Sequence, residues 1–444
     1  MASTVKETAA PFVELEEVDG VKALEWVKER NRESAARFDK VIPGVPTLAE
    51  LKTDLLKILQ AKDRIPSISI RTSSDGQSMV YNFWQDAKNP KGIYRRQTLE
   101  AYQANSEEWE TLLDIDALSK KEKENWVFKG ASCAPKVRTR CMVRLSRGGG
   151  DASVDREFDV EQKDFVKGGF QLPEAKSTFG WLDDDTLMGG IPIEGETSDS
   201  GYPTTVRMWK RGDDLKKSTI VFRGEKTDIG VWGRRLRSHH SQKGHGQKGE
   251  EPVVLDLIVR AIDMNTVETY VRMPNDSWRL LPIPKTADVE GLSGQFVLFA
   301  TRKDGEAFGT KLRSGWLYAF DLSSWMDGGA AEKTVKVETV FRPTAKRVFS
   351  YLTTTKSRIV LSYMDNVRGR LVEMKRGANG VWTEHALKLP GSEGAISASY
   401  SSYDEEYFTV FYQDFLTPSE MFLVDGARKL TKLRTTPARF DAKG

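Results

Sequence analysis

The sequence has little cysteine, no long hydrophobic run and no dominant sign of charge. Cys133 and Cys141 are the only cysteines in 444 residues, which excludes a disulfide-rich secreted scaffold. No apolar run approaches the roughly 18 residues that a membrane span needs. Lysine and arginine total 67 against 64 aspartates and glutamates, a formal net charge of +3, so binding of nucleic acid by bulk charge is not expected. We therefore expect neither nucleic acid nor a membrane among the partners.

The start of the chain also lacks the features of a secretory signal. Residues 1–11 contain no charged start followed by an apolar stretch of about 7–15 residues. Together with the low cysteine content, this predicts a cytoplasmic location. The two cysteines lie eight positions apart without a second pair, so we expect no zinc site and predict two buried free thiols.

Aromatic and turn-forming residues are plentiful instead. The chain has 20 Phe, 12 Tyr and 11 Trp with 36 Gly and 17 Pro, a composition that favours strands joined by turns. Residues 1–62 differ from the rest, because Val21, Leu24 and Val27 recur at helical spacing. Thr47 and Glu50 then have the spacing of a capping box before a second apolar helix face. The sequence predicts a helical extension over 1–62 and a β domain over 63–438.

A repeat of about 50 residues runs through this β domain. At seven positions, an apolar residue at the end of an expected strand is followed by a polar residue and a loop. These positions recur at intervals of 50 to 58 residues, at Tyr102, Phe158, Trp209, Ile262, Phe320, Met374 and Val424. A unit of this length holding about four strands has the size of a propeller blade. We predict an all-β fold, a seven-bladed β-propeller with a short N-terminal helical extension. A sandwich or two barrels is the alternative if the spacing is accidental.

Local motifs for hydrolytic chemistry are weak. The nucleophile elbow G-x-S-x-G is absent, and the fragments at 291–294 and 391–394 lack its spacing, so both are interpreted as loop turns. Gly148-Gly149-Gly150 lacks the context of a phosphate-binding loop and is predicted to connect a hairpin. Asn275-Asp276-Ser277 is a glycosylation sequon that matters only in a secreted protein.

Metal-binding patterns are equally weak. His239, His240 and His245 lie in the polar stretch 238–251, which we interpret as a solvated insertion loop without a standard ligand spacing. His385 is isolated in a strand-like run and is interpreted as structural. Asp183-Asp184-Asp185 is flanked by two apolar pairs, which favours a tight turn over a cation site. We predict no catalytic, cofactor-binding or metal residue, and no cofactor.

Ten blocks of sequence, taken in order, resemble the N-terminal part of the S9A serine peptidases, the prolyl oligopeptidase family. The resemblance covers almost the whole chain, and the blocks are Val13–Glu17, Ala23–Val27 with Asn31, Tyr81–Asp86, Trp109–Asp114, Glu124–Val127, Leu145–Gly149, Leu172–Ser177, Trp181–Leu187, Ser200–Pro203 and Tyr412–Pro418. The family carries a seven-bladed propeller, in agreement with the repeat.

The resemblance implies a function that needs a further domain. In the family an α/β-hydrolase domain with the catalytic serine, aspartate and histidine follows the propeller, and no position here matches those motifs. Residues 439–444 are expected to begin the linker to that domain, and 1–62 are expected to pack on it. We expect the propeller to gate access by size for a serine endopeptidase that cleaves short peptides after proline, and to be inactive alone.

Two other functions remain open at this stage. A free-standing propeller that binds peptides or a protein on one face would need no second domain. An enzyme that uses the propeller channel, such as a metal-dependent hydrolase or a glycosidase, would need carboxylates or histidines that converge there.

Overall fold

The structure is a computed structural model of the chain. Seven small antiparallel sheets make up most of it. The structure describes residues 12–442 except 18–19, 41–42, 74–75, 240–251, 328–334, 392 and 402–403. The chain divides into two units, residues 1–62 with 86–88, and residues 63–85 with 89–444.

The first unit is helical in its described part. A short 3-10 helix, η1 (Val13–Leu15), precedes α1 (Val21–Phe38) and α2 (Leu48–Leu59). The predicted capping box begins α2, since the Thr47 side chain accepts from the Glu50 amide while the Glu50 carboxylate accepts from the Thr47 amide. None of the residues of these three helices is buried, so their apolar side chains face away from any core in the described residues.

The second unit holds the sheets. Blade 1 comprises β1 (Ile68–Thr72), β2 (Ser78–Trp84), β3 (Ile93–Thr98) and β4 (Glu110–Asp114). Blade 2 comprises β5 (Trp126–Cys133), β6 (Arg140–Arg147), β7 (Ser153–Asp159) and β8 (Asp164–Phe165), and β9 (Gln171–Ala175) also pairs with β7. Blade 3 comprises β10 (Thr178–Asp183), β11 (Thr186–Gly190), β12 (Thr205–Lys210) and β13 (Thr219–Arg223). Blades 4 and 5 comprise β14 (Gly230–Ser238), β15 (Val253–Ala261), β16 (Val267–Arg272) and β17 (Trp278–Leu280); and β18 (Ala287–Ser293), β19 (Phe296–Thr301), β22 (Leu317–Asp321) and β23 (Val337–Phe341). Blades 6 and 7 comprise β24 (Arg347–Thr354), β25 (Ile359–Asp365), β26 (Arg368–Arg376) and β27 (Trp382–Ala386); and β28 (Ala395–Ser401), β29 (Phe408–Gln413), β30 (Glu420–Val424) and β31 (Leu430–Thr435). Between strands lie α3 (Leu99–Gln103), α4 (Ile115–Glu122), η2 (Leu215–Lys217), the hairpin β20 (Gly305–Ala307) and β21 (Thr310–Leu312), and α5 (Leu322–Asp327).

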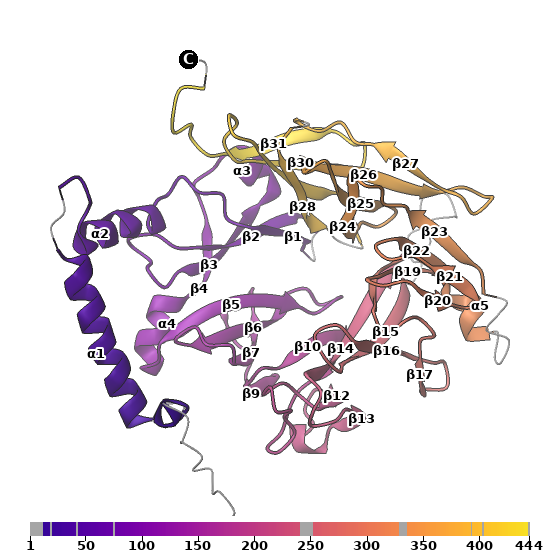
Figure 1. The fold of residues 1–444 in the computed structure, drawn as a ribbon, viewed down its shortest axis with the longest axis horizontal. Helices are drawn as coiled ribbons and strands as arrows, with labels where there is room; N and C mark the ends of the chain where they lie inside the picture. The colour runs from indigo at the N-terminus through magenta and orange to yellow at the C-terminus, as the bar shows by residue number, and fades with distance from the viewer. Residues whose placement is uncertain are drawn as a thin grey trace, which may run out of the picture. The chain divides into compact units, whose positions relative to one another are not determined.

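These seven sheets are the blades of a propeller, as the repeat predicted. Figure 1 shows them around a common centre, and first strands of neighbouring blades contact one another, as in β10 with β14 and β18 with β24. The hydrophobic core of the described residues consists of seven clusters, and each cluster lies between two adjacent blades. Blades therefore stabilise one another through their facing apolar surfaces.

The ring closes between blade 7 and blade 1 through side chains. Each of these two blades is built from four consecutive strands, so no strand is shared across the closure. Ile70 and Val80 of blade 1 pack with Met421 of blade 7 in one buried cluster. Arg434 donates to the Tyr102 carbonyl oxygen at 2.7 Å and lies over its ring. Burial of apolar surface, supported by this arginine, takes the place of a shared strand.

The two cysteines contradict the prediction of free thiols. Cys133 at the end of β5 pairs in register with Cys141 near the start of β6, with their Cα atoms 3.8 Å apart, and a disulfide joins them. Cys141 is fully buried. The eight-residue spacing did not reveal the pairing, because only the folded hairpin turns the two side chains toward each other.

We expect the disulfide to stabilise the fold. The Cys133→Ser/Cys141→Ser variant should lose about 2–3 kcal/mol in its free energy of unfolding, the loop-closure entropy of so short a loop. Urea unfolding with and without dithiothreitol measures this: the reductant should destabilise the wild type and leave the double variant unchanged. A wild type that is fully reduced, as shown by alkylation, yet equally stable would contradict the prediction.

No helix in the described part of the chain is long and apolar enough to cross a membrane.

Candidate functional site

The centre of the propeller is a polar channel. A cavity of about 400 Å³ is lined by the first strands of blades 1 to 4 and by Asp404 and Glu405, which follow β28. A second cavity, of about 530 Å³, adjoins it and shares five of its residues, Arg71, Thr72, Arg138, Asp404 and Glu405. These residues come from blades 1, 2 and 7, so the side chains that border both cavities reach inward from different sheets.

The two ends of the channel follow from the strand directions. Neighbouring strands in each blade are antiparallel, so all first strands begin on one face of the propeller, the near face, and end on the other, the far face. Thr72 ends β1 and lines both cavities, Cys133 ends β5 and lines the first, and His239, which follows β14, lines the second. The second cavity therefore lies in the far part of the channel, and the first extends from there toward the middle, where Arg234 lines it.

Charged side chains cross the far end of the channel. Arg138 of blade 2 donates to the Asp404 carboxylate of blade 7 at 2.8 Å, and the Asp404 Oδ1 atom lies 3.3 Å from the His239 Nε2 atom of blade 4. Thr72 of blade 1 donates to the Glu405 carboxylate at 2.8 Å. We call Thr72, Arg138, His239, Asp404 and Glu405 the far-end network. Because it joins four blades, it narrows the channel and ties the ring together.

His239 corrects one interpretation of the sequence. The composition of 238–251 predicts a solvated loop, but Ser238 is buried at the end of β14 and His239 is half-buried against Asp404. The strand takes in the first residue of the polar stretch, and His239 follows it directly. His240 and His245 lie outside the described residues.

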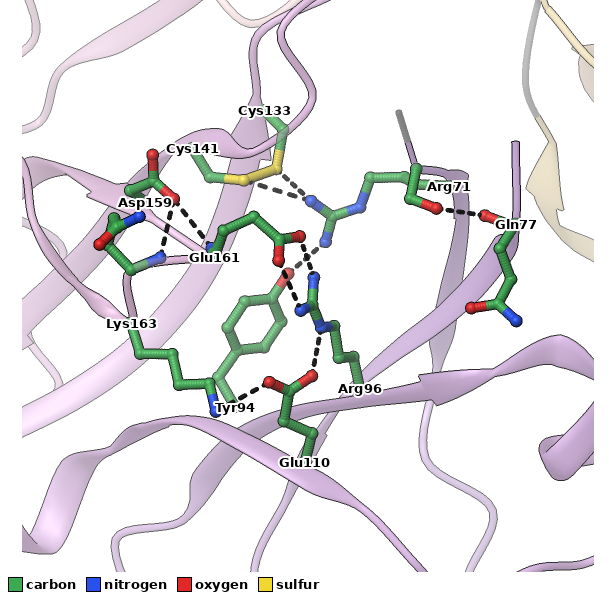
Figure 2. A network of polar contacts seen from close by, with 12 residues as sticks. Arg71, Gln77, Tyr94, Arg96, Glu110, Cys133, Cys141, Asp159, Glu161 and Lys163 are labelled. Carbon is green, nitrogen blue, oxygen red and sulfur yellow. Dashed lines mark hydrogen bonds and ion pairs between the residues drawn. A yellow bond between two sulfur atoms is a disulfide. The ribbon is translucent and has the colours of Figure 1, made fainter. Parts of the chain in front are cut away.

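A second polar network joins blades 1 and 2 beside the channel (Figure 2). The Arg71 guanidinium donates to both sulfur atoms of the disulfide, at 3.2 Å to Cys141 Sγ, and to the Tyr94 hydroxyl. Burial raises the pKa of Tyr94, although Arg71 acts in the opposite direction. Arg96 of blade 1 forms a bidentate pair with Glu161 of blade 2, at 2.6 and 3.0 Å. The channel wall is therefore fixed by charge-assisted hydrogen bonds between blades.

The chain enters and leaves the propeller on its near face. Asp63 precedes β1, Arg439 follows β31, and their side chains form an ion pair at 2.6 Å. The three most exposed large apolar side chains of the described residues, Met264 at 85%, Val367 at 88% and Phe415 at 98%, lie in loops between second and third strands. Such loops are on the near face, so this face carries the most exposed apolar side chains of the described residues.

The remaining candidates occupy turns and edges. Asp183–Asp185 forms the predicted turn between β10 and β11, where Asp184 accepts from the Lys136 amide at 2.9 Å. Gly148–Gly150 connects the hairpin of β6 and β7, with positive φ at Gly148. His385 is exposed on the outer strand β27. No group of three or more potential metal ligands occurs among the described residues.

Other predicted features have local roles as well. Asn275 accepts from the Ser277 hydroxyl at 2.7 Å within the turn between β16 and β17. The fragment 291–294 runs from β18 into a hairpin turn, and Ser392 of the fragment 391–394 lies outside the described residues. The sequence reasoning missed Arg71, Arg138 and Asp404. Arg71 lies near the end of the first strand β1, and Arg138 and Asp404 lie in the loops that follow the first strands β5 and β28, so recognising them required the correct strand boundaries.

Known proteins place this architecture in a family. The model of the prolyl oligopeptidase N-terminal β-propeller domain matches residues 9–242. The chain belongs to the prolyl oligopeptidase family. An uncharacterized peptidase of Sinorhizobium fredii is 35% identical over 99% of the chain, and another of Rickettsia prowazekii is 29% identical over 97%. The solved structure of a post-proline cleaving enzyme from Rickettsia typhi matches 97% of the chain with a TM-score of 0.83 and 28% identity.

The prolyl oligopeptidase relatives are longer than this chain. It spans 58% of the length of each of the two curated relatives and 61% of the solved Rickettsia typhi chain. The chain therefore shares its fold with the part of the Rickettsia typhi structure that it matches, and its family with all three proteins.

Proposed function

We propose that this chain is the propeller portion of a prolyl oligopeptidase-like serine endopeptidase, which covers the active site of an α/β-hydrolase domain and selects short peptides for cleavage after proline. The length of the relatives supports a further domain, since about two fifths of each extends beyond the match. The reaction is supported by the relative from Rickettsia typhi, which is a post-proline cleaving enzyme.

The contrast between the two faces is the observation that carries the proposal. The near face holds both chain connections, Asp63 and Arg439, together with the most exposed apolar side chains. A second domain linked to residue 439 and docked there would bury these side chains. The far end is crossed by the far-end network, so a hydrolase on the near face would be reached only by small or unfolded substrates.

The helical unit supports a second contact with that domain. The most exposed apolar side chains of its helices are Val21 at 71%, Phe38 at 70% and Ile58 at 68%. None of the residues of α1 and α2 is buried. An amphipathic helix in water gains stability mainly by burying its apolar face. We propose that the hydrolase domain supplies the missing surface.

Hydrolysis of a proline-containing chromogenic peptide tests the proposal. The chain alone should be inactive, and activity should appear when a separately expressed hydrolase domain of the same family is added. The hydrolase domain alone should also cleave a folded protein substrate that the mixture spares. Cleavage by the chain alone, or a mixture no more selective than the hydrolase domain, would contradict the proposal. The latter outcome would favour a free-standing peptide-binding propeller.

The proposal includes a cytoplasmic location, which fractionation of cells that express the protein would test.

A further inference from the structure

Among the described residues, no carboxylate forms a hydrogen bond or ion pair with the Arg234 guanidinium. Arg234 lies on β14, the first strand of blade 4, and its side chain is exposed to the 400 Å³ cavity. It donates to the Val289 carbonyl oxygen at 2.7 Å, and Glu290 acts on it through space without a hydrogen bond. Burial lowers the pKa of Arg234, which means that the surrounding protein disfavours its charge. An anion in the cavity would relieve this cost.

Arg71 is a second such cation in the same cavity. Its hydrogen-bond partners are the disulfide sulfur atoms and the Tyr94 hydroxyl, and its guanidinium lies 3.6 Å from the centre of the Tyr81 ring. All of these groups are neutral. Within the part of the chain that the structure describes, no carboxylate forms a hydrogen bond or ion pair with Arg71 or Arg234.

The acidic groups of the cavity are already engaged. Arg138 and His239 contact Asp404, and the Thr72 hydroxyl donates to Glu405. Among the described residues that line the cavity, cations outnumber acids: the arginines are Arg71, Arg138, Arg234, Arg235 and Arg237, and the acids are Asp404 and Glu405. The acid beside Arg235, Asp256, is shared with Arg272. The cavity has an excess of positive charge in a confined space.

We propose that this cavity binds the carboxylate of a short peptide, with the guanidinium groups of Arg71 and Arg234 as its ligands. Guanidinium groups pair with carboxylates through two parallel hydrogen bonds, and both arginines still have donors that can make them. The inference rests on the proposed function, because every cleavage by an endopeptidase creates a peptide with a new C-terminal carboxylate. A site between the far part and the middle of the channel would hold that end away from the near face.

Calorimetric titration of the 444-residue chain with three tripeptides tests the inference. The probes are acetyl-Ala-Gly-Pro with a free carboxylate, the same peptide as its amide, and acetyl-Glu-Gly-Pro-amide. We expect the free carboxylate to bind at least tenfold tighter than the neutral amide, and more weakly as salt is raised. If the glutamyl amide binds tighter still, the site takes a side-chain carboxylate. Equal binding of all three peptides, or no binding, would overturn the inference.

Variants locate the site independently of folding. Arg234→Gln should reduce the preference for the carboxylate at least tenfold, and Arg234→Lys should restore part of it. Arg71→Gln should act in the same direction, but it also removes contacts between blades. The matched control is Arg313→Gln, whose exposed partner Asp304 is remote from the cavity residues. An unchanged preference in Arg234→Gln would exclude Arg234 as a ligand. The titration measures binding and not hydrolysis, so its result can be interpreted even if the chain is not part of a peptidase that cleaves after proline.

Discussion

Replacement of Glu157 by glutamine is expected to lower the free energy of unfolding by about 1.5–3 kcal/mol, the contribution of hydrogen bonds to a charged group. Glu157 on β7 of blade 2 is 1% exposed and accepts two hydrogen bonds from Arg211, at 2.6 and 2.7 Å. It also accepts from the Phe170 amide at 2.9 Å. Arg211 follows β12 of blade 3, so the variant removes an ion pair that links blade 2 to blade 3.

The electrostatics of Arg211 explain the size of this effect. Hydrogen bonds with Glu157 raise the pKa of Arg211 above its usual value, and Asp185 adds to the shift. A neutral glutamine leaves the guanidinium with the exposed Asp185 as its acidic partner. Urea unfolding followed by tryptophan fluorescence measures the loss, since Trp181 and Trp209 pack in the cluster between the same blades.

A surface pair provides the control. Glu174 forms an ion pair with Arg147 in which both side chains are about 40% exposed, and Glu174→Gln should cost less than about 1 kcal/mol. A Glu157→Gln variant no less stable than Glu174→Gln would show that the ion pair between blades 2 and 3 contributes nothing beyond the apolar cluster.

The largest effect on association is expected on the near face. The double variant Met264→Lys/Phe415→Lys should bind a hydrolase domain of the family at least about 30-fold more weakly than the wild type, because truncating or charging one central anchor costs about 2 kcal/mol or more. Both side chains are exposed in the chain alone, so its own free energy of unfolding should change by less than about 0.5 kcal/mol. Surface plasmon resonance measures the first quantity and urea unfolding the second.

A substitution on the opposite face is the matched control. Val381 is 55% exposed in the turn between β26 and β27, a connection between third and fourth strands and therefore on the far face. Val381→Lys should leave association unchanged. Equal loss of binding in both variants would assign the docking surface elsewhere and would remove the main support for the proposed arrangement.

The repeat was readable from the sequence because one strand position recurs in every blade. Five of its seven marker residues, Phe158, Trp209, Phe320, Met374 and Val424, lie on the third strand of blades 2, 3, 5, 6 and 7. All five are buried, since a third strand packs against blades on both sides. Ile262 does not fit the pattern because it follows the second strand of blade 4, β15, and precedes the third, β16. Tyr102 misses it because α3 is inserted in blade 1.

The candidate site was not readable in the same way. Thr72, Arg138, His239 and Asp404 are separated by 66 to 332 positions along the chain, and no motif or spacing links them. Thr72 ends a strand and the other three lie in loops, and only the closed ring brings these positions together. The disulfide has the same origin, because the register of β5 and β6 decides whether two cysteines face each other.

The sequence by itself determined the periodic burial of apolar strands, the helices α1 and α2 and the peptidase family, because each depends on local patterns that repeat or align. Only the tertiary structure decided which charges meet in the channel, which arginines lack an acid and which face carries the most exposed apolar side chains. Those properties depend on long-range packing of blades, where a side chain's neighbours come from other sheets and its desolvation is set by the closed ring.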